Sequence, residues 1–242
     1  MKTYKIYLIR HGQIQGSLDG KYIGQTDEKL SEAGEKELYE LKNKCTYPEI
    51  EVLFSGSLNR CLQTCDILYP DRQPIVMDGL NEFDFGEFEG QTAEKLKDDP
   101  DFIEFLEGGE EAKAPFGESN LDFVKRICET FEKIVDALMS NGITEAGIVT
   151  HGGVISTLLS IYGSPEAPAS SWRIEPGRGC LLTGNTGIWS RIKKLEVMDE
   201  IPYEIRDDET GEMKIWNHYN YDSEFYKPDF NPEYDDDEDG EN

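Results

Sequence analysis

The chain has 242 residues, of which 37% are hydrophobic, and its formal net charge at pH 7 is −26. This length is sufficient to bury a full core as one large domain. So negative a surface repels nucleic acids and anionic membranes, and we expect neither as a partner. Acidic residues concentrate towards the C-terminus, where residues 196–242 hold 18 Asp and Glu against 3 Lys and Arg.

The charge pattern predicts three parts. We expect residues 1–195 to form one domain, residues 196–233 to be an acidic, aromatic-rich extension packed partly against it, and residues 234–242 to be a disordered acidic tail. No stretch has the length and apolar character of a membrane span or a signal peptide, so we expect a cytoplasmic protein. The five cysteines and three histidines lack the spacing of a zinc site, which predicts reduced cysteines and no metal or other cofactor.

Apolar runs alternate with segments of helical periodicity along the first domain. Helices are predicted to begin at Ser31, near Leu58, at Ser119 and after His151. Buried strands are predicted at residues 4–9, 52–55, 75–77 and 146–150, with a closing pair of strands at 180–183 and 186–197. This alternation predicts an α/β domain of three layers, α/β/α, around a mainly parallel central sheet.

Several predicted strands end in residues that suit a phosphate group. Arg10 and His11 follow the first strand, and His151 follows a later one. Arg60 lies in the first turn of the helix after the second strand, and Glu82 lies on a nearby loop. Ligands bind beyond the carboxyl ends of the strands in open α/β sheets. Two arginines, two histidines and one acid suit phosphoryl transfer, in which positioning and charge stabilisation dominate.

Six short motifs occur in a fixed order. They are LIRHG at 8–12, LSEAG at 30–34, SGSLNR at 55–60, LNE with FG and EG within 80–90, PFGES at 115–119 with Arg126, and VTHGG at 149–153. This set resembles the histidine phosphatase superfamily in its phosphoglycerate-mutase-like branch, which includes small-metabolite phosphatases such as α-ribazole phosphatase. The resemblance covers residues 5 to about 192 and implies the phosphoglycerate-mutase-like fold.

The resemblance also implies a phosphohistidine mechanism that needs no metal. His11 would attack phosphorus, and for this it must be neutral. Arg10, Arg60 and His151 would bind the phosphoryl oxygens. Glu82 would protonate the leaving oxygen, and we expect the aromatic loop around it to raise its pKa. Further contacts with the substrate are predicted at Gln13, Ser17, Gly24 and Gly152.

Two positions depart from the pattern of the family. Many relatives have threonine where Ile14 stands and asparagine where Ser17 stands, and the asparagine commonly helps to hold the phosphoryl group. Ile14 has no hydrogen-bonding group in its side chain, and Ser17 is shorter than asparagine. We therefore expect a change in phosphate affinity or in the path of this loop.

Three functions remain open at this point: a phosphatase, a phosphoglycerate-type mutase, and a binding module with weak catalysis. Mutases of the family carry a longer segment between the glutamate and the second histidine, with basic residues that close over the sugar acid. Here 69 positions separate Glu82 from His151, and the intervening stretch is largely acidic. This favours a phosphatase acting on a small phosphorylated substrate such as a sugar phosphate, a nucleoside-like phosphate or a phosphoglycerate.

Overall fold

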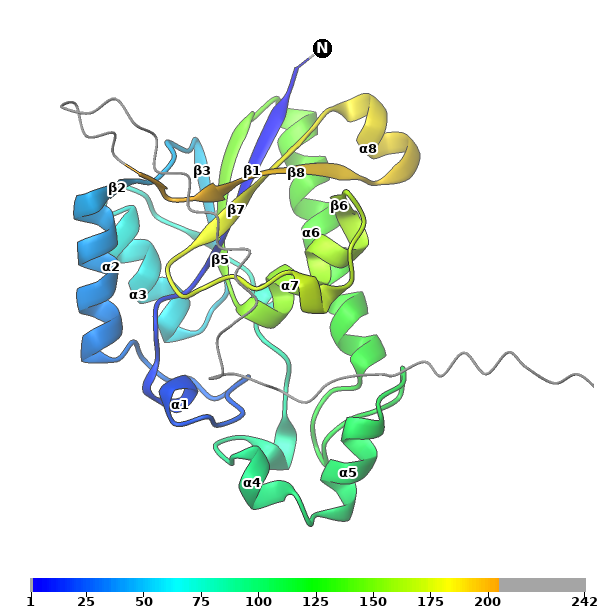
Figure 1. Ribbon diagram of the computed structural model, residues 1–242. Coiled ribbons are helices and arrows are strands. Elements are labelled where there is room, and N and C mark those ends of the chain that lie inside the picture. Colours follow the sequence, from blue (N-terminus) through cyan, green and yellow to red (C-terminus); the bar gives the residue numbers. More distant parts are fainter. Residues whose placement is uncertain (1, 205–242) are drawn as a thin grey trace, which may run out of the picture.

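The computed structural model describes residues 2–204, and its centre is a seven-stranded sheet of order β4-β3-β5-β1-β7-β8-β6 (Figure 1). The predicted tail at 234–242 and most of the predicted extension at 196–233 lie outside the described residues. The strands are β1 (Tyr4–Arg10), β2 (Cys45–Thr46), β3 (Val52–Ser55), β4 (Ile75–Val76), β5 (Glu145–Thr150), β6 (Gly163–Ser164), β7 (Gly179–Gly184), β8 (Leu195–Ile201) and β9 (Tyr203–Glu204).

Most neighbouring strands of this sheet are parallel. Strands β4, β3, β5 and β1 pair in parallel, as do β6 and β8, whereas β7 runs antiparallel between β1 and β8. Strands β2 and β9 form a separate pair. The predicted mainly parallel sheet is therefore confirmed.

Helices cover both faces of the sheet (Figure 1). The helices and 3-10 turns are α1 (Gln15–Leu18), α2 (Glu32–Lys44), α3 (Asn59–Leu68), η1 (Asp78–Leu80), η2 (Gly86–Phe88), α4 (Ala93–Leu96), α5 (Pro100–Glu107), α6 (Asn120–Asn141), α7 (Gly152–Tyr162), η3 (Ala169–Ser171) and α8 (Thr186–Ile192). Alternate residues of β1 point to opposite faces. Ile6 and Leu8 pack with α6 and α7, whereas Tyr7 and Ile9 pack with α2 and α3. The predicted three-layer arrangement is confirmed.

The helix starts predicted at Ser31 and Ser119 are confirmed by side-chain caps. The Ser31 hydroxyl accepts a hydrogen bond from the backbone N–H of Gly34 at 3.0 Å, and the Ser119 hydroxyl accepts one from Asp122 at 3.1 Å. Both serines satisfy backbone donors that have no partner within the helix. These caps set the first turns of α2 and α6.

The predicted strand over residues 186–197 is wrong in its first half. Residues Thr186–Ile192 form α8, and β8 begins only at Leu195. The side chain of Asn185 accepts hydrogen bonds from the N–H groups of Gly187 and Ile188, both at 3.0 Å, and so nucleates the helix. Burial of Trp189 against α6 and α7 outweighs the strand propensity of the isoleucines.

A smaller cluster lies beyond the end of the sheet, under α4 and α5 (Figure 1). Phe88, Leu96, Phe102 and Ala114 form its buried centre. It packs the aromatic loop that follows Glu82 into the domain. Among residues 2–204, no helix combines the length and the apolar character needed to cross a membrane.

Candidate active site

The register of three parallel strands brings the predicted site residues to one edge of the sheet. Arg10 lies opposite Thr150, and Ser55 lies opposite Val149. The backbone N–H of His11 donates to the Thr150 carbonyl at 2.9 Å. Strands β1 and β5 therefore end side by side, and the residue that follows each strand is a histidine.

The His11 ring is held in one tautomer by its own loop. Its Nδ1 lies 2.7 Å from the Gly12 carbonyl oxygen, which accepts but cannot donate. In the neutral ring the proton is therefore on Nδ1, and Nε2 keeps its lone pair. Gly12 is itself tied down, because its N–H donates to the Thr64 hydroxyl at 3.0 Å.

Both histidines are buried and favour the neutral form. His11 is 5% exposed and His151 is fully buried, and their ring centroids lie 5.0 Å apart. Burial, followed by the charges of Arg60 and Arg10, holds the pKa of His11 well below its usual value. Burial and the proximity of His11 lower the pKa of His151 in the same way. A neutral imidazole is the form that a nucleophile requires.

Arg60 lies in the first turn of α3 and is fully buried. Its Nε donates to His151 Nδ1 at 3.2 Å, so the proton of neutral His151 is on Nε2, which lies 3.5 Å from the sulfur of Cys61. The two terminal nitrogens donate to the carbonyls of Gly24 and Thr26. A guanidinium group has five N–H donors, so two are left beyond these three bonds.

The loop over residues 24–26 holds Arg60 on one side and a carboxylate on the other. Glu89 accepts hydrogen bonds from the backbone N–H groups of Gly24, Gln25 and Thr26 and from the Thr26 hydroxyl, at 2.6–3.3 Å. A Cβ on Gly24 would lie 1.7 Å from the Phe83 carbonyl oxygen. Only glycine allows this approach, so Gly24 packs the loop of Arg60 against the loop of Glu82.

Glu82 lies between this loop and the start of α7. Its two carboxylate oxygens accept from the backbone N–H groups of Phe83 and Gly153, each at 3.0 Å. Burial raises the pKa of Glu82 from its ordinary value, although these two hydrogen bonds and the charges of Arg60 and Arg10 oppose the shift. The predicted direction of this pKa shift is confirmed. A carboxyl of raised pKa can carry a proton to a leaving group.

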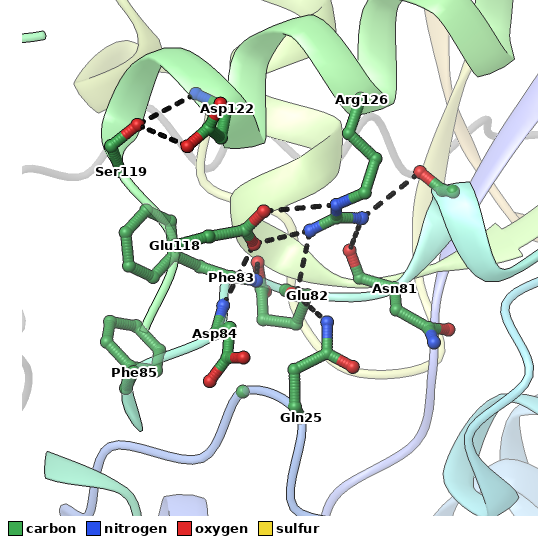
Figure 2. Close-up of polar contacts among 12 residues, drawn as sticks. Gln25, Asn81, Glu82, Phe83, Asp84, Phe85, Glu118, Ser119, Asp122 and Arg126 are labelled. Carbon is green, nitrogen blue, oxygen red and sulfur yellow. Dashed lines mark hydrogen bonds and ion pairs between the residues drawn. The ribbon is translucent and has the colours of Figure 1, made fainter. Parts of the chain in front are cut away.

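The backbone on both sides of Glu82 is held by Arg126 and Glu118 (Figure 2). Arg126, on α6, donates to the carbonyls of Asn81 at 2.8 Å and of Glu82 at 3.2 Å. It also forms a two-pronged pair with Glu118, at 2.5 and 3.1 Å. Glu118 in turn accepts from the backbone N–H of Asp84 at 2.9 Å.

The other predicted contacts lie near this edge of the sheet in different ways. Gly152 is the first residue of α7, and a Cβ there would lie 3.3 Å from Arg10 Nε. The Gln13 amide donates to the Ile14 carbonyl at 2.9 Å, and Ser17 lies on α1. Ile14 is 1% exposed and packs in the apolar cluster of α2 and α3, which explains a hydrophobic residue there.

Sequence reasoning missed the residues that support the predicted five. Gln25 donates to the Glu82 carbonyl at 2.7 Å, and Glu89 holds the loop over 24–26. Glu89 and the Glu118–Arg126 pair belong to the motifs at residues 80–90 and 115–119 with Arg126, and this was the signal that could have identified them. Their backbone partners lie far away in the chain, so their roles could not be predicted. Within residues 2–204, no three His, Cys, Asp or Glu side chains are grouped to hold a metal ion.

A three-layer α/β/α fold with two histidines, two arginines and a carboxyl of raised pKa beyond the ends of its strands has the groups that phosphoryl transfer requires. The family model described as the histidine phosphatase superfamily (branch 1) matches residues 6–192. The chain belongs to this superfamily, and its class is that of phosphoric monoester hydrolases.

Relatives within the superfamily carry more than one name. Adenosylcobalamin/alpha-ribazole phosphatase of Escherichia coli (strain K12) is 25% identical over 73% of this chain and 87% of its own length. A protein of Enterobacter sp. (strain 638) named "Probable phosphoglycerate mutase GpmB" is 26% identical over 74% of this chain and 83% of its own. The crystal structure of the alpha-ribazole phosphatase from Shigella flexneri matches with a TM-score of 0.67 at 23% identity, over 80% of this chain and 94% of that one. This structural match supports the fold.

Proposed function

We propose that the chain hydrolyses a small phosphorylated metabolite, without a metal, through a phosphohistidine intermediate on His11. The observation that carries the proposal is the hydrogen bond between His11 Nδ1 and the Gly12 carbonyl. It leaves the Nε2 lone pair available for attack on phosphorus. Burial, together with the positive charges of Arg60 and Arg10, keeps the ring neutral, and the same charges attract the phosphate group.

The first step transfers the phosphoryl group to the enzyme. The lone pair of His11 Nε2 forms a bond to phosphorus, and the bond between phosphorus and the ester oxygen breaks. Glu82 gives its proton to that leaving oxygen, so an alcohol departs and a carboxylate remains. Burial raises the pKa of Glu82 and so favours the protonated form.

The second step releases phosphate. Water attacks phosphorus, the bond to Nε2 breaks, and the Glu82 carboxylate takes up the proton of the attacking water. His11 is again neutral and Glu82 is again protonated. The same carboxyl thus acts as acid in one step and as base in the other.

The arginines supply the positive charge that a metal provides in other phosphatases. Arg60 has two N–H donors that its three hydrogen bonds do not use. Arg10 is the last residue of β1, opposite the last residue of β5. His151 orients Arg60 through its Nδ1 and packs edge-on against His11. Direct contacts of substrate with His151, Gln13, Ser17, Gly24 and Gly152 belong to the same proposal.

A mutase is the second candidate, because GpmB-named proteins are among the relatives. A mutase must hold an anionic phosphoglycerate while it returns the phosphoryl group. The segment 98–112, which contains α5, has seven acidic and no basic residues. Such a segment disfavours a basic lid over a sugar acid, and we therefore propose hydrolysis.

The test is release of inorganic phosphate from a panel of small phosphate esters in the presence of a chelator. We expect the native chain to release phosphate, and His11→Ala to lose at least about a thousandfold of that rate. His218→Ala, at the third histidine of the sequence, is the matched control. With an ester whose leaving group needs no protonation, such as a nitrophenyl phosphate, Glu82→Gln slows mainly the hydrolysis of the intermediate, so an alkali-stable, acid-labile phosphoryl label should accumulate on His11.

Other outcomes reject the proposal in distinct ways. Interconversion of phosphoglycerates without release of phosphate would establish the mutase. Full activity of His11→Ala would exclude His11 as the nucleophile. A native chain that neither releases phosphate nor interconverts phosphoglycerates would favour a binding module.

A further inference from the structure

The catalytic carboxyl of the proposed mechanism lies on a loop, and loops are the least rigid supports for a reacting group. Glu82 nevertheless has its backbone fixed on both sides. Arg126 binds the carbonyls of Gly79, Asn81 and Glu82, at 2.8–3.2 Å, on the side towards α6. Glu118 binds the N–H of Asp84 just beyond. Figure 2 shows that the two side chains meet each other across the loop.

The charges of the two anchors offset each other. Arg126 and Glu118 are paired through both prongs, and their side chains are only 26% and 15% exposed, so solvent screens each poorly. An arginine alone beside Glu82 would favour the carboxylate over the carboxylic acid. The Arg126 charge reaches the site, since it contributes to lowering the pKa of His151.

We propose that Glu118 and Arg126 act as one neutral clamp, which positions Glu82 without adding net charge beside it. This inference rests on the proposed role of Glu82 as proton donor. Arg126 supplies a rigid fork of donors that can bind several carbonyls at once. Glu118 cancels its charge and extends the clamp to the far side of the loop. Both are positioning residues, since no contact with substrate is assigned to them.

Other charged and titratable groups surround the site. The charges of Arg60 from α3 and Arg10 from β1 act on the Glu82 carboxyl, and the buried His11 and His151 follow β1 and β5. None of these four residues is substituted in the clamp variants. Any difference between the clamp variants therefore reports on Glu118 and Arg126.

The test compares the pH dependence of kcat/KM, together with kcat at one pH, in four variants. In Glu118→Gln the unpaired Arg126 charge should move the alkaline limb to lower pH by about half a unit or more. In Arg126→Met the unpaired Glu118 charge should move that limb upwards, and kcat should fall about 10- to 100-fold because the loop is released. The double variant should restore the native limb while kcat stays low. Glu145→Gln, which breaks an ion pair with Lys5 where β1 pairs with the start of β5, should change neither quantity.

The clamp is supported if the alkaline limb moves in opposite directions in the two single variants and returns to its native position in the double variant. Shifts in the same direction, or no shift in either, overturn it. If Arg126→Met does not fold, Arg126→Lys keeps the charge and loses the fork, so kcat should fall while the limb stays in place. A shifted limb in Arg126→Lys together with unchanged kcat overturns the proposal.

A measurement without turnover separates this inference from the proposed function. The Glu82 carboxyl can be titrated by carbon NMR in protein labelled at glutamate, with Glu82→Gln identifying its signal. The same opposite shifts are expected in that titration. A native chain that releases no phosphate defeats the proposed function, and the titration still decides whether the clamp controls the charge at Glu82.

Discussion

The backbone N–H of Gly153 donates to the Glu82 carboxylate at 3.0 Å, and a Cβ at position 153 would lie 2.5 Å from the same carboxylate. The start of α7 therefore receives a side chain that comes from a loop 71 positions earlier in the chain. The atoms that a Cβ would meet belong to the flexible end of a side chain. An added methyl group thus displaces Glu82 and leaves the backbone in place.

The Gly153→Ala variant is expected to separate activity from stability. The displaced carboxyl should lower kcat about 10- to 100-fold. The thermal midpoint should stay the same or rise slightly, because alanine in a helix is favoured over glycine by up to about 1 kcal/mol. Phosphate release and calorimetry check the two parts. Ser160→Ala, further along α7, is the control, and an unchanged kcat in Gly153→Ala would show that Glu82 does not need its observed position.

Both limbs of the pH profile of the native enzyme should differ from those that an ordinary histidine and an ordinary glutamate would give. His11 must be neutral to attack, and its pKa is lowered, so activity should persist below the usual histidine value of 6.5. Glu82 must be protonated to donate, and its pKa is raised, so activity should be lost at a higher pH than an ordinary glutamate would dictate. Stopped assays of kcat/KM between pH 3 and 9 measure both limbs.

The alkaline limb should disappear with the carboxyl. Glu82→Gln cannot titrate at this position, so its residual activity, lower by about 10²–10⁴-fold, should be flat on that side. An alkaline limb that survives in Glu82→Gln would assign it to another group. His11 would remain responsible for the acid limb in both proteins.

Glu89 should affect the binding of phosphate although it lies on the far side of the loop from Arg60. In Glu89→Gln the N–H groups of Gly24, Gln25 and Thr26 lose a charged acceptor, which costs about 1–3 kcal/mol of stability. The carbonyls that orient Arg60 then loosen, so KM for a phosphate ester should rise about 10-fold. Initial-rate kinetics at varied ester concentration give KM. Glu87→Gln, an exposed neighbour, should behave as the native chain, and an equal effect in both variants would argue against a specific role of Glu89.

Phe116 is 90% exposed and has a φ of +61°, which glycine adopts more easily than phenylalanine. It follows Pro115 in a turn closed by the bond from Gly117 N–H to the Ala114 carbonyl, 2.9 Å long. Relief of about 1–2 kcal/mol of strain outweighs the greater chain entropy of glycine, so Phe116→Gly should be about 0.5 kcal/mol more stable. Urea unfolding measures this difference. Phe116→Ala keeps the strain and should show no gain; equal gains in both would exclude strain as the cause.

Short-range sequence patterns predicted most of the main helices and strands. Apolar runs marked β1, β3 and β5, and serine caps marked the starts of α2 and α6. The strand prediction over 186–192 failed because Ile188, Trp189 and Ile192 favour strands by themselves, whereas Asn185 and the burial of Trp189 favour a helix. The departure at Ile14 also has a structural reason, since its side chain fills the core beside α2.

The sequence by itself determined the α/β class, the alternation of the main strands and helices up to β7, and the residue types that follow β1, β3 and β5, because these depend on periodicity and on neighbours in the chain. Only the tertiary structure decided which atoms these residues meet. The tautomer of His151 and the carbonyls bound by Arg60 and Arg126 depend on residues that are 34–91 positions apart. The burial that raises the pKa of Glu82 likewise comes from the packing of separate segments. Hydrogen bonds and desolvation act over a few ångströms of space, and folding alone sets which distant segments come that close.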